Sequence, residues 1–267
     1  MTSFPGPTWL VGCGNMAGAM VAGWRAAEVD FTQVTAVRPS GTPVDGVQTV
    51  TELPSGPAPA LVMLGFKPQK LDEVAPALAE RIDPATIILS LLAGVEAASL
   101  RARFPVARAV VRAMPNLPVA QRKGVTALYS EDRDITALDT VSALIALLGF
   151  APVVTDEAQF SAIGAVAGSG PAYVARFIDA LANAAAERGL DSGLAQTLAL
   201  ETVLGTGWLA AANRGPMDDL VRRVASPRGT TLAGLAVLDA ELPSLIGRTL
   251  DAAIARGEEL AAASRNG

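Results

Sequence analysis

Residues 8–17, Thr-Trp-Leu-Val-Gly-Cys-Gly-Asn-Met-Ala, decide the fold of this chain. The first four residues predict a short buried strand, and the apolar face of residues 16–26 predicts a helix. Between them stands Gly-x-Gly-x-x-Ala, whose glycines allow a tight turn and a close approach of a pyrophosphate to the backbone. A strand before this pattern and a helix after it indicate a dinucleotide site. The predicted cofactor contacts here are Gly12, Cys13, Gly14, Asn15, Met16 and Ala17.

The end of the second predicted strand, residues 33–37, indicates which dinucleotide binds. Proteins that prefer NAD place Asp or Glu near this strand end, where it holds the ribose 2′-hydroxyl. Arg38 and Ser40 stand here instead, and a guanidinium with a hydroxyl suits a 2′-phosphate. We therefore predict NADPH as the preferred cofactor, with weaker use of NADH. The alternative is a solvated arginine in a turn.

Strands alternate with helices up to about residue 155. Further strands are predicted at residues 61–64, 86–90, 109–112, 124–129 and 152–155, with a helix at 135–148. This alternation predicts a Rossmann-like, doubly wound α/β domain over residues 1–155. Open α/β sheets bind their ligands at the carboxyl ends of the strands. The remaining predicted cofactor contacts follow such strand ends: Gly65, Phe66, Lys67, Pro68, Ala93 and Asn116.

Residues 156–267 predict a second domain that is entirely helical. Its helices are expected at residues 170–188, 192–214, 217–224, 231–239 and 243–264. Several of them are apolar on more than one side, and such a helix must be buried. A domain of about 110 residues cannot bury them all alone, so we expect a partner chain whose helices interleave with these in a homo-oligomer.

A hydroxyl-rich loop, residues 226–234, interrupts this helical region with the sequence Ser-Pro-Arg-Gly-Thr-Thr-Leu-Ala-Gly. Its turn directs the backbone N–H groups of Thr230 and Thr231 toward one point, where a helix begins. Free N–H groups at a helix start, with hydroxyls beside them, form a receptor for a small carboxylate. An ordinary helix N-cap is the alternative, because Ser and Thr are preferred there.

Composition excludes several functions. The net charge of −5 and the lack of a basic run argue against nucleic acid as a partner. The chain has no histidine, so neither a Ser-His-Asp hydrolase nor a histidine-ligated metal fits, and no metal is expected. The single cysteine, Cys13, fits a reducing compartment, and no signal peptide or membrane span is evident. We expect a cytoplasmic protein without membrane partners.

Five segments together resemble the pyrroline-5-carboxylate reductase family over essentially the whole chain. They are residues 12–17, 66–69, 114–116, 168–173 and 226–234. The resemblance implies hydride transfer from NAD(P)H to the C=N carbon of L-1-pyrroline-5-carboxylate, which gives L-proline. It also implies a C-terminal dimerisation domain whose partner chain completes each active site.

The resemblance also assigns residues to the substrate. It places the substrate carboxylate on Ser226, Gly229, Thr230 and Thr231, and the Thr231 hydroxyl near the ring nitrogen as the catalytic group. Glu157 matches a family position close to the substrate, although a charge in a helix's first turn is an equal alternative. Arg228 is a departure, because the family usually has a second glycine there.

Two rival functions remain open. One is another NADP-dependent reductase of the same architecture, acting on a hydroxy acid or a different imine. Hydroxy-acid dehydrogenases of this kind generally use a lysine in the helical domain, and this chain has none after Thr155. The other rival is a dimer that senses dinucleotides without catalysis, which an intact substrate loop argues against.

Overall fold

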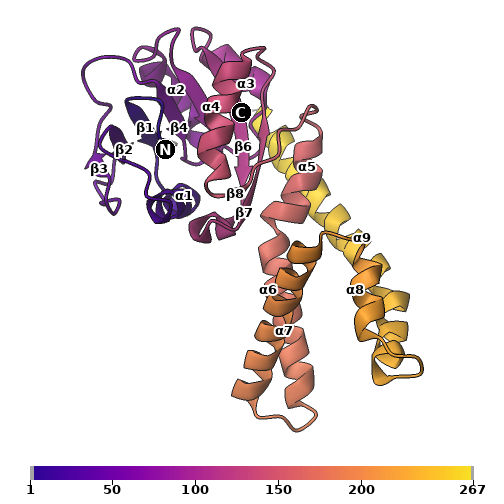
Figure 1. The fold of residues 1–267 in the computed structure, drawn as a ribbon. Coiled ribbons are helices and arrows are strands. Elements are labelled where there is room, and N and C mark those ends of the chain that lie inside the picture. The colour runs from indigo at the N-terminus through magenta and orange to yellow at the C-terminus, as the bar shows by residue number, and fades with distance from the viewer. Residues whose placement is uncertain (1–2, 266–267) are drawn as a thin grey trace. The chain divides into compact units, whose positions relative to one another are not determined.

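The computed structural model describes residues 3–265, which form two compact units (Figure 1). The first unit contains the chain up to Ser169 together with the stretch from Ala253 onward, and the second contains Gly170–Ala252. The first unit is built on a sheet and the second entirely from helices. The predicted domain boundary at residue 155 stays a prediction.

The first unit holds an eight-stranded sheet with the order β3-β2-β1-β4-β5-β6-β7-β8. All neighbouring strands are parallel except β6 and β7. The chain leaves β1 in one direction for β2 and β3, and returns to β1's other side for β4 and β5, which is the doubly wound topology that the sequence predicts. The strands are β1 Thr8–Val11, β2 Val34–Val37, β3 Gln48–Val50, β4 Leu61–Leu64, β5 Ile87–Ser90, β6 Ala109–Pro115, β7 Gly124–Tyr129 and β8 Gly149–Phe150.

Helices cover both faces of this sheet (Figure 1). The helices α1 (Asn15–Ala26) and α4 (Ile135–Ala146) enclose one hydrophobic core, where Trp24 donates a hydrogen bond to the Leu144 carbonyl at 2.9 Å. The helices α2 (Leu71–Ala79) and α3 (Ala97–Arg103) enclose the other. Successive side chains of β4 alternate between these cores, with Met63 in one and Val62 in the other. This explains why central strands are apolar on both faces.

The last strand lies earlier in the chain than predicted. We expected it at residues 152–155, but β8 is Gly149–Phe150, and beyond it only Val153 forms an isolated bridge with Leu128. Gly149 has φ +139°, and a Cβ there would lie 2.1 Å from the Gly124 carbonyl oxygen. Two glycines thus let the backbones pair closely at this point, while Pro152 has no N–H to donate to a ladder.

The second unit is formed by three helices and most of a fourth. These are α6 Gly170–Ala186, α7 Ser192–Asn213, α8 Met217–Val224 and α9 Thr230–Arg265. Asp191 caps α7, because its side chain accepts the Leu194 N–H. The prediction of separate helices at 231–239 and 243–264 was wrong, because α9 continues through Pro243. Proline removes one hydrogen bond there, but its fixed φ is helical.

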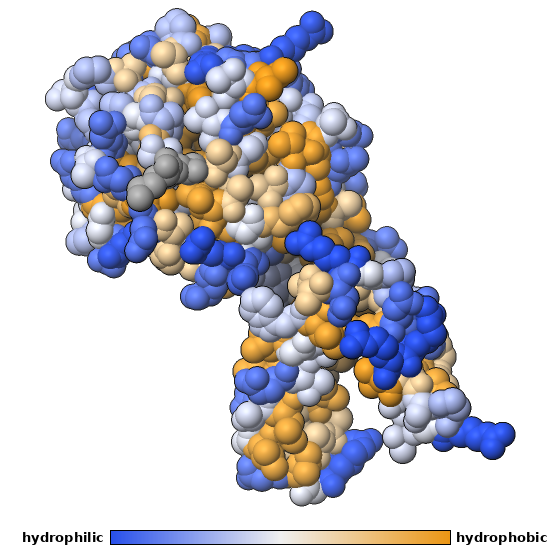
Figure 2. Space-filling model, viewed as in Figure 1, coloured by the Kyte–Doolittle hydropathy of each residue, from blue (hydrophilic) through white to orange (hydrophobic). Residues whose placement is uncertain are grey.

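Two short segments connect the sheet to these helices. Helix α5 (Gln159–Ile163) passes directly into a π-helical turn, η3 (Gly164–Gly168), which the sequence did not predict. Beyond it, α6 and α7 expose many apolar side chains, which appear as hydrophobic surface over these helices in Figure 2. No helix in the described part of the chain is both long and apolar enough to cross a membrane.

Candidate functional site

At Gly12, the glycine loop after β1 is packed too closely for any larger residue. Gly12 has φ +76°, and a Cβ there would lie 2.8 Å from the Phe66 Cβ. A Cβ on Gly65 would lie 2.3 Å from the Gly12 carbonyl oxygen and 3.1 Å from the Ala17 Cβ. The two strand ends that precede Gly12 and Gly65 therefore meet in one close contact, which includes the small Ala17 that the pattern requires.

The N-terminus of α1 is open for an anion. Gly14 is the N-cap residue and no side chain caps the helix. A Cβ on Gly14 would meet nothing within 4 Å, so the space above the backbone there is free. Uncapped N–H groups at a helix start attract a pyrophosphate, and Asn15 and Met16 supply the next two. The geometry therefore fits the predicted pyrophosphate position.

The loop after β2 brings Arg38 beside the glycine loop. Its Nη1 donates to the Thr42 carbonyl at 3.0 Å, and the Ser40 and Thr42 hydroxyls lie 2.9 Å apart. Arg38 also lines a pocket of about 230 Å³ together with Cys13 and Arg25, and Arg25 pairs there with Asp45. The guanidinium of Arg38 has no carboxylate partner among the described residues. It is therefore available for a phosphate.

Cys13 is a buried thiol and not a reactive one. Burial raises the pKa of Cys13 above its ordinary value, and the nearby positive charge of Arg38 lowers it by less. The thiol is therefore protonated at neutral pH, and only a thiolate is a good nucleophile. Cys13 is therefore a packing residue of the glycine loop.

The ends of β4 and β5 present the other predicted cofactor loops. Lys67 is exposed and precedes a 3-10 turn, η1 (Pro68–Lys70), and its carbonyl accepts the Lys70 N–H at 2.9 Å. This residue shapes the turn through its backbone. Ala93 is exposed after β5, next to Gly94 at φ +76°. Both lie at the carboxyl edge of the sheet, where ligands bind.

The side chain of Asn116 makes its hydrogen bonds inside the protein. Only 7% exposed, it accepts the Val125 N–H at 2.8 Å and donates to the Ala167 carbonyl at 3.0 Å. These bonds tie the end of β6 to β7 and to η3. The side chain is therefore an architectural link, and its contact with the cofactor stays a prediction.

Glu157 has partners that sequence reasoning did not find. Its Oε1 accepts a hydrogen bond from Arg112 Nη1 at 2.5 Å and from the Ala97 N–H at 2.7 Å. Arg112 lies in the buried strand β6 with a side chain only 7% exposed. A buried arginine in an apolar strand requires a paired carboxylate. That arginine is the signal by which the pair could have been predicted.

The loop before α9 is tightly turned within the second unit. The Gly229 N–H donates to the Ser226 carbonyl at 3.0 Å, and a Cβ on Gly229 would lie 2.4 Å from the Ser226 Oγ. Helix α9 begins at Thr230, one residue before the predicted start, and Thr231 is half-buried. The loop is therefore compact at Gly229 and brings hydroxyl groups to the first turn of a long helix.

Arg228 adopts an unusual backbone conformation in this loop. Its φ is +59°, in the left-handed region that favours glycine. The glycine that the family usually has at this position would adopt this conformation without strain. The Arg228 side chain is exposed and makes no hydrogen bond or ion pair with any described residue.

The structure thus groups the predicted residues into two sets. The predicted cofactor contacts gather at the carboxyl edge of the sheet in the first unit, together with Glu157. The loop that contains Ser226, Gly229, Thr230 and Thr231 belongs to the second unit. The glycine loop, the doubly wound sheet and the following helices define a dinucleotide-binding protein of the Rossmann class.

Known proteins narrow this class to one family. The family model described as pyrroline-5-carboxylate reductase dimerisation matches residues 157–260. A pyrroline-5-carboxylate reductase from Pseudomonas aeruginosa is 35% identical over 94% of this chain and 96% of its own length. The corresponding protein from Synechocystis is 34% identical over 94% and 97%. The chain therefore belongs to the pyrroline-5-carboxylate reductase family.

Solved structures of pyrroline-5-carboxylate reductases have the same fold as this chain. A pyrroline-5-carboxylate reductase from Coxiella burnetii, 30% identical, superposes with a TM-score of 0.88 over 96% of this chain and 98% of its own. A Plasmodium falciparum pyrroline carboxylate reductase, solved with NADP bound, reaches a TM-score of 0.83 at 20% identity over 97% and 99%. The second likeness shows the fold alone, and both confirm the predicted α/β architecture with its helical C-terminal region.

Proposed function

We propose that this chain catalyses the reduction of L-1-pyrroline-5-carboxylate to L-proline, with NADPH as the hydride donor. The observation that carries this proposal is the loop before α9. There a Cβ on Gly229 would lie 2.4 Å from the Ser226 Oγ and 3.1 Å from the Ser226 carbonyl oxygen, and a 36-residue helix starts at the next residue. The family to which the chain belongs is named for this reaction.

The substrate carboxylate binds at the start of α9. The N–H groups of Thr230 and Thr231 and the hydroxyls of Ser226 and Thr230 donate hydrogen bonds to it. The positive end of the helix dipole stabilises its charge. The Thr231 hydroxyl then lies near the ring nitrogen, where it orients the imine and stabilises the proton that the nitrogen carries.

The glycine loop holds the pyrophosphate of the cofactor at the N-terminus of α1, and Arg38 with Ser40 holds its 2′-phosphate. When bound, NADPH supplies the hydride. The loops that carry Phe66 and Ala93 place the nicotinamide at the carboxyl edge of the sheet. The chain's own contribution is therefore to orient two ligands and to exclude water between them.

The absence of histidine is compatible with this chemistry. The cyclic imine can bind in its protonated form, so the electrophile is activated before it arrives. The reaction then needs no strong protein acid, because hydride transfer to an iminium carbon leaves a neutral amine. A hydroxyl oxygen that accepts a hydrogen bond from the iminium N–H is enough to orient the ring.

We also propose that the protein acts in the cytoplasm as a homo-oligomer whose helical regions interleave. The exposed apolar side chains of α6 and α7 support the interleaving, because a second copy offers an equally apolar surface. The single, buried Cys13 and the need for NADPH support a reducing compartment.

The test is the loss of NADPH absorbance with purified protein and pyrroline-5-carboxylate, repeated with NADH. Rapid loss with NADPH and slower loss with NADH is the expected result. Loss with NADH alone would keep the reductase and remove the phosphate site. Measurable NADPH binding without any loss would refute the reductase and favour the sensing dimer. A 3-hydroxy acid with NADP serves as the control for the hydroxy-acid alternative.

A further inference from the structure

One partly buried carboxylate connects three elements at the carboxyl edge of the sheet. Glu157 Oε1 accepts a hydrogen bond from Arg112 of β6 at 2.5 Å and from the Ala97 N–H at the start of α3 at 2.7 Å. The Glu157 side chain is 20% exposed and that of Arg112 is 7% exposed. We call this set of three residues, Arg112, Glu157 and Ala97, the latch. Little room is left at this oxygen for a further ligand.

An aromatic ring holds the arginine from another side. The guanidinium carbon of Arg112 lies 4.6 Å from the centre of the Phe160 ring. Phe160 in turn contacts Tyr129 edge-on at 6.2 Å, and Tyr129 faces Arg112 across the β6–β7 ladder. Cation–π contact and the ion pair therefore fix the guanidinium in one orientation.

The latch lies in line with the residues that end β1, β4 and β5, after which the predicted cofactor loops begin. Strand pairing aligns Arg112 with Ser90, Ser90 with Leu64, and Leu64 with Val11. Ser90, Leu64 and Val11 each end their strand. The Ala93 loop follows Ser90, the Phe66 loop follows Leu64, and the glycine loop follows Val11. The latch is therefore level with the predicted cofactor site.

The loop at residues 91–96 is fixed at both ends. At its start, the Ser90 hydroxyl accepts the Leu92 N–H at 3.2 Å. At its end, α3 begins at Ala97, and its N-cap residue Glu96 provides no side-chain cap. Glu157, 60 residues further along the chain, supplies the missing cap. The exposed Ala93, a predicted cofactor contact, lies between these two fixed points.

We propose that Glu157 is a positioning residue for the cofactor and that it does not touch the substrate. Through the latch it fixes the 91–96 loop, and this loop places the cofactor's nicotinamide half. This assignment rests on the proposed function for the identity of the cofactor. It replaces the substrate contact that the family resemblance implies for Glu157, because Oε1 of the carboxylate already accepts hydrogen bonds from both Arg112 and Ala97.

The two roles predict opposite kinetic results for Glu157→Gln. A positioning role raises the dissociation constant and the KM of NADPH about tenfold, the effect of losing one charged hydrogen bond, and changes the KM of the imine less than about twofold. A substrate contact raises the KM of the imine and leaves NADPH binding unchanged. NADPH binding is measured by fluorescence titration without substrate, and both KM values by steady-state kinetics.

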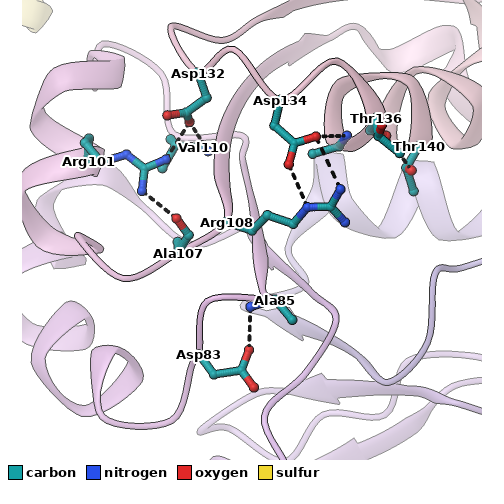
Figure 3. A network of polar contacts seen from close by, with 11 residues as sticks. Asp83, Ala85, Arg101, Ala107, Arg108, Val110, Asp132, Asp134, Thr136 and Thr140 are labelled. Carbon is teal, nitrogen blue, oxygen red and sulfur yellow. Dashed lines mark hydrogen bonds and ion pairs between the residues drawn. The ribbon is translucent and has the colours of Figure 1, made fainter.

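The chain offers a matched control at the other end of β6. Asp132 accepts a hydrogen bond from Arg101 at 2.5 Å and from the Val110 N–H at 2.7 Å, so it has the same chemistry as Glu157 (Figure 3). Asp132→Asn should lower the melting temperature about as much as Glu157→Gln and leave NADPH affinity unchanged. An equal loss of NADPH affinity in both variants would show a general loss of stability and overturn the positioning role.

A second variant keeps the test valid if Glu157→Gln does not fold. Phe160→Leu removes the ring beside the guanidinium and leaves both charges, so NADPH affinity should fall about threefold, in line with a partly buried cation–π contact. Unchanged affinity in a folded Phe160→Leu variant would overturn the proposal. A wild-type protein that binds NADPH but does not reduce the imine would refute the proposed function alone, since the binding comparison needs no turnover.

Discussion

The two units of this protein differ in how far they bury their own apolar residues. In the first unit, the side chains of β1, β4 and β5 are buried by helices of the same unit. In the second unit, Leu194 and Trp208 of α7 remain 50% and 56% exposed, although helices α6 and α7 pack on each other. The first unit therefore buries its apolar side chains in a core of its own. The second unit leaves large apolar side chains exposed for contact with another copy of the chain.

This difference follows from the side chains that the helices bury. The buried residues of α6 and α7 are small, namely Ala182, Ala195 and Ala199. Alanines allow two helices to approach closely but bury little apolar area. The large apolar residues face outward and need a second copy, which agrees with a family model named for dimerisation.

A charge on the exposed surface of α7 should have the largest effect. Leu198→Arg places a guanidinium where we propose that the partner packs, and a buried unpaired charge is strongly destabilising. We expect monomers in light scattering and almost complete loss of activity. Val106→Arg is the matched control, because both residues are 48% exposed but Val106 belongs to the first unit. A Leu198→Arg protein that remains oligomeric would remove the distinction between the units.

The next largest effect is expected in the loop before α9. Thr231→Ala removes the hydroxyl that orients the imine, and kcat should fall about 100-fold, because the ring is then no longer held in position for hydride transfer. The dissociation constant of NADPH should change less than about twofold, because the cofactor residues belong to the first unit. Rapid-mixing kinetics and a binding titration separate the two quantities. Equal losses in both would contradict the separate roles of the units.

A smaller effect is expected at the end of β2. Arg38→Ala removes the guanidinium available for the 2′-phosphate, and the KM of NADPH should rise about tenfold. The KM of NADH should not change, since NADH has no phosphate there. The ratio of kcat/KM for the two cofactors measures this directly. An unchanged ratio would make Arg38 an ordinary turn residue.

The smallest effect concerns acid stability within the first unit. Asp134 caps α4, and the hydrogen bonds from Arg108 and the Ala137 N–H hold the pKa of Asp134 below its ordinary value (Figure 3). The folded state thus favours the carboxylate, so this stabilisation is present above the ordinary pKa of about 4 and is lost as the pH falls through the lowered value.

The melting temperature of Asp134→Asn should therefore lie below that of the wild type at pH 7, and the two should converge in acid. Asparagine keeps one oxygen that can accept the Ala137 N–H, and it loses the charge together with one of the two acceptors for Arg108. A difference that is constant from pH 7 to pH 3 would show that the charge has no part in it.

The sequence predicted most of the sheet because its strands are short, apolar and bounded by turn residues. Thr8–Val11, Leu61–Leu64 and Gly124–Tyr129 were predicted to the residue. Strand β3 was missed, because Gln48–Val50 is three residues long and polar enough for a loop. The site at the glycine loop was predictable for a similar reason, since its residues are adjacent in the sequence.

Other features depend on contacts that no local pattern reveals. The latch joins residues 45 and 60 positions apart, so Arg112 in its apolar strand indicates that a carboxylate is needed but not which one, and Ala97 gives no indication at all. The continuity of α9 through Pro243 was missed because proline is more often a helix boundary than an interior residue. Both errors have one cause, which is that tertiary context overrides a local preference.

The burial of Cys13 has a practical consequence. It is the only thiol in the chain, it lies within the glycine loop, and it borders the pocket that Arg38 also lines. A thiol reagent can therefore react only when this loop opens, and its rate reports the frequency of that opening. A dinucleotide bound on this loop should slow the labelling. One native cysteine thus serves as an occupancy probe that needs no engineered label, no substrate and no turnover.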